Sequence, residues 1–456
     1  MVSPDNVGTP ITGVRISTVV PGRVRGDASE DHELTNMDLA LKLHYIKGVY
    51  FFKSTSSADH DQLVLSVAEM KKPMFPLLDQ FFVTAGRIRR SDGAAGRPYI
   101  KCNDAGVRIV EAFCEKTIDE WLAMADEFGT TSNNCKNFNQ GLCYDHVLGP
   151  DLGFSPLVYF QFTWFKCGGL SVGLSWAHLL GDVLSASAFI NTWAKIMAGH
   201  VPQKNIHVPS CGKLPKDPPP RLAISKKPFS LKELDLVGNH WSVTANNCQS
   251  MRTHSFRVTS KQLDLLMSNT CGKKAANFSQ FEILSAVIWR SLSRIRESKG
   301  PKIVTICCYD SRRRGVENEI PSNKGMVLST VEADLEADIS ELAFLISEKR
   351  TIENDAIEEM VKKENNKFDF FVYGANLTFV NLEEVDIYGL EVKGQKPTFA
   401  SYTIDGVGDE GLVLVLPAGP KYSEEDDANG RTVTVVLPKD HIARLENELK
   451  AHWTIT

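Results

Sequence analysis

Apolar and polar residues along the first half of the chain fall into runs that are typical of β-strands separated by turns. Segment 14–22, VRISTVVPG, alternates with a period of two and stops at Pro-Gly. Segment 99–112 has two β-rich runs around NDAG, which predicts a hairpin. A second hairpin is predicted for 157–177, where LVYFQFTWF and GLSVGLSWA flank KCGG. The next run, VLSASAFINTWAKIM, has the apolar spacing of a helix.

The second half of the chain combines long helical patterns with short apolar strands. Segment 277–296 predicts a strongly amphipathic helix. Its apolar face comprises Phe281, Leu284, Ile288, Leu292 and Ile295. Three runs, LTFVNL, LVLVLP and TVTVVLP, predict strands, and KDHIARLENELKAH predicts a last helix. Because strands and helices do not alternate regularly, we expect an α/β fold with mixed sheets instead of a doubly wound parallel sheet.

A linker is predicted near the middle of the chain. The stretch KLPKDPPPRLAISKKPFS is rich in proline and lysine and has weak periodicity. A chain of 456 residues is too long for one small domain, since domains usually hold about 100–200 residues. We therefore predict an N-terminal domain at 1–205, a crossover linker at 206–250 and a C-terminal domain of similar size at 251–456.

Composition and charge limit the classes of protein that fit. With 43% hydrophobic and 23% charged residues, the chain can bury a large core. A formal net charge of −5 argues against a nucleic-acid-binding surface. We find no uncharged apolar stretch of about 18 residues, and so predict no transmembrane segment.

Two patterns that suggest a metal or a cofactor lack the context that either would need. Cys135, Cys143 and His146 lie in an asparagine-rich loop with no fourth ligand, so we predict no metal site. GVGDEG at 406–411 fits G-x-G-x-x-G, but a strand follows it where a dinucleotide site needs a helix. We interpret these glycines as a hairpin turn.

The stretch LSWAHLLGDVLSA at 174–186 places His178 and Asp182 where a predicted strand meets a predicted helix. A histidine titrates near pH 6.5 and suits general-base catalysis, and Gly181 disfavours a helix that runs through 178–182. Asp182 is placed to cap the following helix or to pair with a cation. The five-residue pattern alone leaves two interpretations open: a catalytic base, or a buried histidine beside a capping aspartate.

Several motifs in the same order along the chain resemble the plant BAHD acyl-CoA-dependent acyltransferases. HLLGD at 178–182 resembles the H-x-x-x-D motif of that family, and AGRIRRSDG with IKCNDAGVRIVEA, within 85–112, resembles its Ala-Gly-Arg and Cys-Asn-x-x-Gly-Val stretch. FSQFEILSAVIWRSLSRIR resembles the long helix of its second domain, and DSRRR at 310–314 its Asp-x-Arg-x-Arg strand end. The likeness extends over nearly the whole chain.

This resemblance implies a fold, a reaction and a ligand. The expected fold is like that of chloramphenicol acetyltransferase: two similar-sized domains with a solvent channel between them and His178 at its middle. Acyl-CoA would be substrate or ligand, with no bound cofactor and no metal. His178 would act as general base, taking a proton from a hydroxyl or amine acceptor that then attacks the thioester. Asp182 would point away from the channel and support the loop.

The chain departs from the family at its second signature, D-F-G-W-G-K-P. Residues 391–397 read EVKGQKP, so Glu391 keeps a carboxylate while the tryptophan is absent. By resemblance, Glu391 would brace Arg312 or Arg314. SNKGM at 322–326 also lacks the usual Phe-Gly-Asn. These departures leave open whether the protein catalyses acyl transfer.

The departures are shared by one group within the family. MDLALKLHYIKGVYFF and YGANLTFVNLEEVDIYGLEVKGQKPTF resemble the eceriferum/glossy wax proteins of plant epidermis. The resemblance implies a monomer that helps a 3-ketoacyl-CoA synthase, the condensing enzyme of the fatty-acid elongase, to make very-long-chain acyl-CoAs for cuticular wax. It also implies a location at the cytosolic face of the endoplasmic reticulum, reached through that partner, or in the cytoplasm.

Three hypotheses follow from the residues and the resemblance together. The protein is an elongation accessory that does not itself transfer acyl groups, or an acyltransferase that moves a very-long-chain acyl group with His178 as base. The third hypothesis is a structural relic in which the histidine is only packed.

Overall fold

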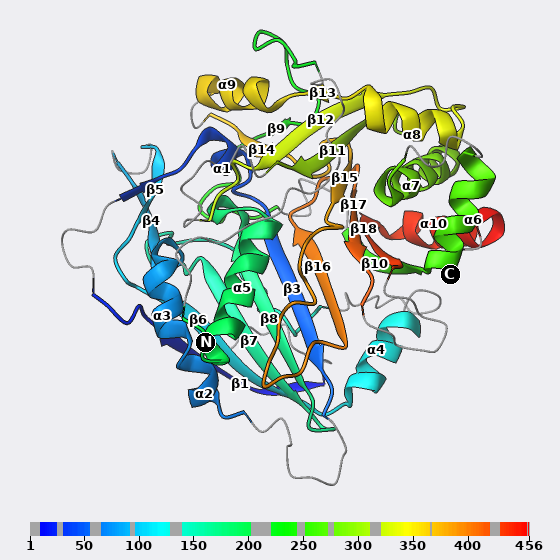
Figure 1. Ribbon diagram of the computed structural model, residues 1–456. Helices are drawn as coiled ribbons and strands as arrows, with labels where there is room; N and C mark the ends of the chain where they lie inside the picture. Colours follow the sequence, from blue (N-terminus) through cyan, green and yellow to red (C-terminus); the bar gives the residue numbers. More distant parts are fainter. Residues whose placement is uncertain are drawn as a thin grey trace.

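The computed structural model describes residues 10–24, 31–54, 65–91, 96–127, 139–201, 220–243, 251–271, 278–310, 321–364, 367–419, 429–453 and 455. Two large mixed sheets, each with its own covering helices, form the body of the molecule (Figure 1). This is the α/β fold with mixed sheets that the apolar pattern predicts.

The first sheet has six strands and supplies the strand that carries His178. In spatial order its strands are β1 (Ile11–Val19), β6 (Val107–Cys114), β7 (Val158–Phe165), β8 (Leu170–Ala177), β3 (Tyr45–Phe52) and β16 (Phe399–Asp405). β7 and β8 pair antiparallel, which confirms the predicted hairpin at 157–177. Every residue of β3 and β8 is buried, because these central strands are covered on both faces.

The predicted hairpin at 99–112 is wrong. β5 (Pro98–Lys101) pairs with β2 (Asp31–Glu33) and β4 (Arg87–Arg90) in a small three-stranded sheet, whereas β6 pairs with β1 and β7. The chain leaves one sheet for the other at the turn, where Arg87 donates hydrogen bonds to the carbonyls of Ala105 and Gly106. The NDAG residues do connect β5 to β6. The strands with which β5 and β6 pair are determined by hydrogen bonds to distant parts of the chain.

The second sheet has seven strands and is built from the second half of the chain. In spatial order its strands are β10 (Met251–Val258), β18 (Arg431–Pro438), β17 (Leu412–Pro417), β15 (Leu377–Asn381), β11 (Ile303–Tyr309), β12 (Met326–Glu332) and β13 (Thr351–Ile352). The helices beside it are α6 (Ser260–Cys271), α7 (Gln280–Arg296), α8 (Ile339–Glu348) and α10 (Lys439–Trp453), which lie together in Figure 1. The predicted apolar face of 277–296 is confirmed, since all five of its residues are buried in the core of this half.

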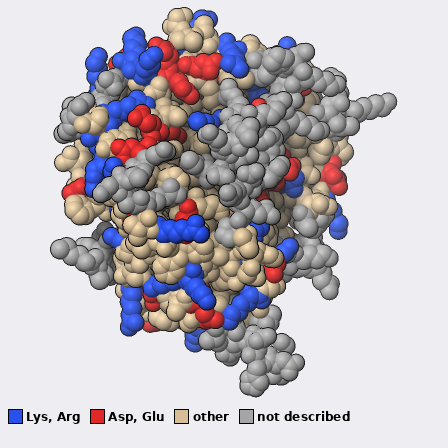
Figure 2. Space-filling model, turned by 60° about the vertical axis from the view of Figure 1, so that its left-hand side comes forward, with Lys and Arg blue, Asp and Glu red and all other residues tan. Residues whose placement is uncertain are grey.

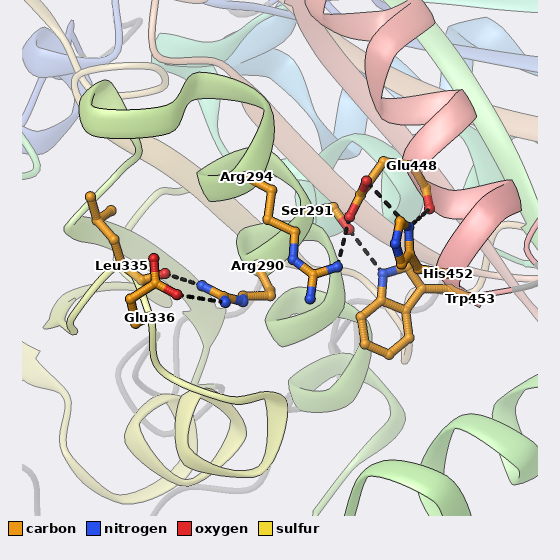
Figure 3. Close-up of polar contacts among 8 residues, drawn as sticks. All are labelled: Arg290, Ser291, Arg294, Leu335, Glu336, Glu448, His452 and Trp453. Carbon is orange, nitrogen blue, oxygen red and sulfur yellow. Dashed lines mark hydrogen bonds and ion pairs between the residues drawn. The ribbon is translucent and has the colours of Figure 1, made fainter.

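Helix α7 is held on its polar side as well as on its apolar side (Figure 3). Arg294 pairs with Glu448 of α10 at 2.9 Å, and the Trp453 indole donates to Ser291 Oγ at 3.1 Å. Arg290 reaches the other way and pairs with Glu336 at 3.1 Å. These contacts join α7 to α10 on one side and to the loop before α8 on the other.

The remaining elements cover the first sheet or join the two halves. They are α1 (Asn36–Ala40), α2 (Val67–Lys71), α3 (Met74–Gln80), α4 (Ile118–Glu127), α5 (Val183–Met197), β9 (Lys232–Leu234), α9 (Asn354–Glu364) and β14 (Asp369–Phe371). Figure 1 shows α5 lying across the first sheet. β9 comes from the predicted linker, of which residues 220–243 are described, and pairs with β14 from the second half.

One strand from the second half of the chain completes the first sheet. β16 lies in the predicted C-terminal range 251–456, yet it pairs antiparallel with β3 along seven residues. The loop 406–411 then carries the chain to β17 in the other sheet, so its interpretation as a hairpin turn is wrong. The boundaries at 205 and 250 stay a prediction. The exchange of β16 means that residues from both halves meet at the end of β8.

The surface carries charges of both signs. On the face shown in Figure 2, lysine and arginine side chains are interspersed with aspartate and glutamate. Among the described residues, no helix has both the length and the apolar character needed to span a bilayer.

Candidate functional site

His178 lies at the C-terminal end of β8, where the strand gives way to a short 3-10 turn, His178–Leu180. Its backbone N–H donates to the His44 carbonyl at 3.1 Å. A Cβ on Gly181 would lie 2.6 Å from the backbone nitrogen of Ser322, so only glycine allows the second half to approach this closely. Gly181 therefore ends the 3-10 turn and also admits the loop around Ser322, which packs against it.

The imidazole of His178 is completely buried and has one hydrogen bond. Nε2 lies 3.0 Å from the Tyr373 hydroxyl, and Nδ1 has no hydrogen-bond partner. Burial lowers the pKa of His178 to about 4, and the polar groups nearby, which are its own backbone, the Asp182 carboxylate and Asn323, offset this only in part. The ring is therefore neutral near pH 7, which is the state that a general base needs, but its basicity is weak.

The accessible channel that the resemblance implies is not open at His178. The residue has no solvent-exposed surface, since His44 and Tyr373 pack against its ring, with centroids at 6.5 and 5.4 Å. The expectation of a histidine exposed in a solvent channel is therefore wrong for this structure. The cause is the filling of the seam by aromatic side chains from both halves.

Tyr373 is held in place by its own loop, which runs from β14 to β15. The N–H of Val372 donates to His44 Nε2 at 3.1 Å, and the Tyr373 carbonyl accepts from Gly408 N at 3.0 Å. A Cβ on Gly374 would lie 2.4 Å from the Gly408 carbonyl oxygen. The glycine-rich loop 406–411 thus has a structural role that its sequence did not indicate: it supports the loop that brings Tyr373 to His178.

Asn323 joins the two halves beside the histidine. Its Nδ2 donates to the His178 carbonyl at 2.9 Å and to Asp38 Oδ1 at 2.9 Å. Asp38 is buried in α1, and its other oxygen accepts from the backbone and hydroxyl of Thr35. Burial raises the pKa of Asp38. No sequence motif singled out Asn323, His44 or Tyr373, although the unusual SNKGM stretch contains the first of them.

Asp182 is the N-terminal cap of α5. Its Oδ1 accepts from the Ser185 backbone N–H at 2.8 Å, and the residue is fully buried. Asp182 lies four residues after His178 in the sequence. Its role as N-cap of α5 is one of the two roles that the strand-to-helix pattern predicted. Its role in supporting the H-x-x-x-D loop stays a prediction.

We expect Asp182→Ala to lower the free energy of unfolding by about 1–2 kcal/mol, because it leaves a buried helix N–H without an acceptor. Asp182→Asn keeps an acceptor oxygen at the same place and should lose less. Urea unfolding of both variants measures the difference. Equal stability of wild type and Asp182→Ala would contradict the capping role.

The described residues do not show the predicted pairing of Glu391 with Arg312 or Arg314. The side chain of Glu391 is exposed, and Arg312 and Arg314 lie outside the described residues. The pairing of Glu391 with either arginine therefore stays a prediction.

The residues considered for a metal have other partners. Cys143 Sγ donates to the Gly48 carbonyl at 3.2 Å, and His146 Nδ1 lies 3.3 Å from the Tyr159 hydroxyl; Cys135 lies outside the described residues. Across the part of the chain that the structure describes, no group of three histidine, cysteine, aspartate or glutamate side chains is placed to hold a metal.

A cavity of about 280 Å³ lies near the start of β3. Leu43 and Tyr45, the chain neighbours of His44, line it together with Lys47. The Lys47 ammonium pairs with Asp145 and Asp405, and these carboxylates raise its pKa against the effect of burial. The charged wall suits polar groups better than an acyl chain.

The pattern of the Transferase family matches residues 10–452. The chain is 42% identical to Protein ECERIFERUM 2 of Arabidopsis thaliana over 454 residues, covering 97% of this chain and 98% of that protein. It is 37% identical to Protein ECERIFERUM 26-like of Arabidopsis thaliana over 453 residues, covering 98% and 97%.

Two solved structures share the fold. The crystal structure of vinorine synthase superposes with a TM-score of 0.65 at 18% identity and covers 97% of this chain and 98% of its own. TRI101 of F. graminearum, complexed with ethyl coenzyme A, superposes with a TM-score of 0.63 at 15% identity and covers 93% and 98%. At these identities the likeness concerns the fold alone.

Proposed function

Because the chain belongs to the BAHD transferase family and to its ECERIFERUM group, we propose that it promotes the elongation of very-long-chain acyl-CoAs for cuticular wax. In this proposal it acts together with the 3-ketoacyl-CoA synthase of the elongase. Its place would be the cytosolic face of the endoplasmic reticulum, through that partner, or the cytoplasm. Acyl-CoA is the proposed ligand, which is consistent with the coenzyme A derivative held by the TRI101 fold.

The enclosure of the His178 side chain supports an accessory role over catalysis of acyl transfer. The Nε2 atom of His178 is sealed from solvent and is already bonded to Tyr373 at 3.0 Å. A general base must reach the proton of its substrate within about 2.6–3.2 Å. In the closed arrangement neither a thioester nor an acceptor has room beside this atom.

A second candidate is acyl transfer to a hydroxyl or amine acceptor. It is favoured by the neutral imidazole of His178, which follows from a pKa of about 4. In that reaction His178 takes the acceptor's proton, the acceptor attacks the thioester carbonyl, and the proton passes to the departing thiolate of coenzyme A. This candidate requires the aromatic residues around the ring to move apart.

The replacement of His178 separates the two candidates. We expect His178→Ala and His178→Gln to retain elongation when each replaces the native protein in a plant or yeast lacking it, because an accessory role needs no base. Wax chain length is measured by gas chromatography. His178→Gln is the matched variant, since its side chain keeps a polar atom for Tyr373 and fills more of the space.

Binding to the condensing enzyme is measured in the same lines by co-purification. Loss of the longest chains in a variant that remains folded and bound would reject the accessory role and support transfer. Retained elongation in both variants would reject transfer as the source of the longest chains.

A further inference from the structure

Tyr373 occupies the position beside Nε2 of His178 at which an acceptor would meet the base. Its hydroxyl lies 3.0 Å from His178 Nε2, which is the distance that general-base catalysis requires of a substrate hydroxyl. The same oxygen lies 3.8 Å from Met326 Sδ. Tyr373 thus presents to His178 the chemical group, a hydroxyl, that an alcohol or phenol acceptor would present.

The contact is built by both halves of the chain. His44, from the first half, accepts a hydrogen bond from Val372 N, and Gly408 binds the Tyr373 carbonyl. The rings of His44 and Tyr373 meet edge to face at 5.0 Å. Backbone hydrogen bonds hold the loop at Val372 and at Tyr373, and the Tyr373 side chain has no exposed surface. The Tyr373 ring is therefore fixed beside His178.

Tyr373 is not itself placed to react as a nucleophile. Burial raises the pKa of its phenol well above 10, while burial lowers that of His178 to about 4. Transfer of the phenolic proton to the imidazole is therefore strongly unfavourable. The hydroxyl fills the acceptor's place without being activated there.

We propose that Tyr373 is an internal occupant of the acceptor position, and that its contact with His178 keeps the H-x-x-x-D site from transferring acyl groups. This inference rests on the proposed function, because it explains how an intact histidine motif belongs to an accessory protein. It predicts a latent site of phenol size beneath the Tyr373 side chain. A phenol supplied from outside is the class of acceptor that this site fits.

The latent reaction balances without any further reagent. In a chain that lacks the Tyr373 ring, His178 takes the proton of the added phenol, and the phenol oxygen forms a bond to the thioester carbonyl. The carbon–sulfur bond breaks, and the imidazolium returns the proton to the thiolate. The products are a phenyl ester and free coenzyme A.

The test uses the full-length purified protein and a long-chain acyl-CoA, with and without phenol. We expect Tyr373→Ala to release coenzyme A at least tenfold faster than wild type when phenol is present, and to form phenyl ester. Adding His178→Gln to this variant should return the rate to that of wild type. Tyr402→Ala is the matched control, since it removes an equally buried tyrosine whose hydroxyl bonds Tyr50 at 2.6 Å instead.

A second variant tests the contact without opening a cavity. Tyr373→Phe keeps the ring and removes only the hydroxyl, so the Nε2 resonance of His178 in protein with ¹⁵N-labelled histidine should shift, as assigned with His178→Gln. Tyr402→Phe should leave it unchanged. An unshifted resonance, or a folded Tyr373→Ala protein with no gain in coenzyme A release, would overturn the proposal. Neither assay contains the condensing enzyme, so failure here leaves the elongation test to be decided separately.

Discussion

Acidification from pH 7 to pH 4 should remove about 6 kcal/mol of folding free energy through the two buried histidines at the seam, His178 and His44. Burial lowers the pKa of His178 to about 4 and that of His44 to about 3, whereas an unfolded chain holds histidine near 6.5. Between these values the unfolded state binds more protons than the folded state. The free energy of unfolding therefore falls as pH falls, by about 1.4 kcal/mol per pH unit for each histidine.

The stabilising contribution of these histidines is complete above pH 6.5 and is lost as the pH approaches the folded values. Urea unfolding at closely spaced pH values measures the slope. His178→Gln and His44→Gln should each reduce the slope of unfolding free energy against pH by the contribution of one histidine. His146, whose pKa burial lowers to about 4, contributes equally to the slope of both variants. Asp38 and Glu282 act in the opposite sense, because burial raises their pKa values. A slope from pH 6.5 to 4 that is the same in wild type, His178→Gln and His44→Gln would contradict the buried, neutral pair.

Replacing Asn323 with alanine should lower the free energy of unfolding by about 3 kcal/mol. The change removes the donor to the Asp38 carboxylate and the donor to the His178 carbonyl, both fully enclosed at the seam. A buried polar group left without its partner costs about 1–3 kcal/mol, and more if it is charged. The exposed neighbour Lys324 supplies the control, since Lys324→Ala should change stability by less than about 0.5 kcal/mol.

The Asn323 effect should depend on Asp38. In a double-mutant cycle, Asp38→Ala combined with Asn323→Ala should cost clearly less than the sum of the two single changes, because the shared hydrogen bond is lost only once. Strict additivity would show that Asn323 does not act through that bond. The cycle thereby tests whether this side chain joins the two halves of the molecule.

The sequence located the strand, turn and helix around His178 because each depends on local spacing. The apolar run of β8, the glycine at 181 and the capping position of Asp182 lie within a few residues of one another, and the structure contains all three. The apolar face of α7 was equally readable, since a period of 3.6 residues is a local property. The order of motifs also placed the chain in its family.

Only the tertiary structure decided what surrounds the histidine. Tyr373 lies 195 residues away along the chain and Asn323 lies 145 residues away, and no local pattern encodes such contacts. The same reason explains why two predicted hairpins were wrong: glycine and asparagine turns fix where the chain reverses, but hydrogen bonding between distant strands selects the sheet. The sequence by itself therefore determined the fold class, the family and the position of His178. The packing of two halves determined that His178 is neutral, enclosed and bonded to Tyr373, because burial and long-range hydrogen bonds exist only after the sheets have come together.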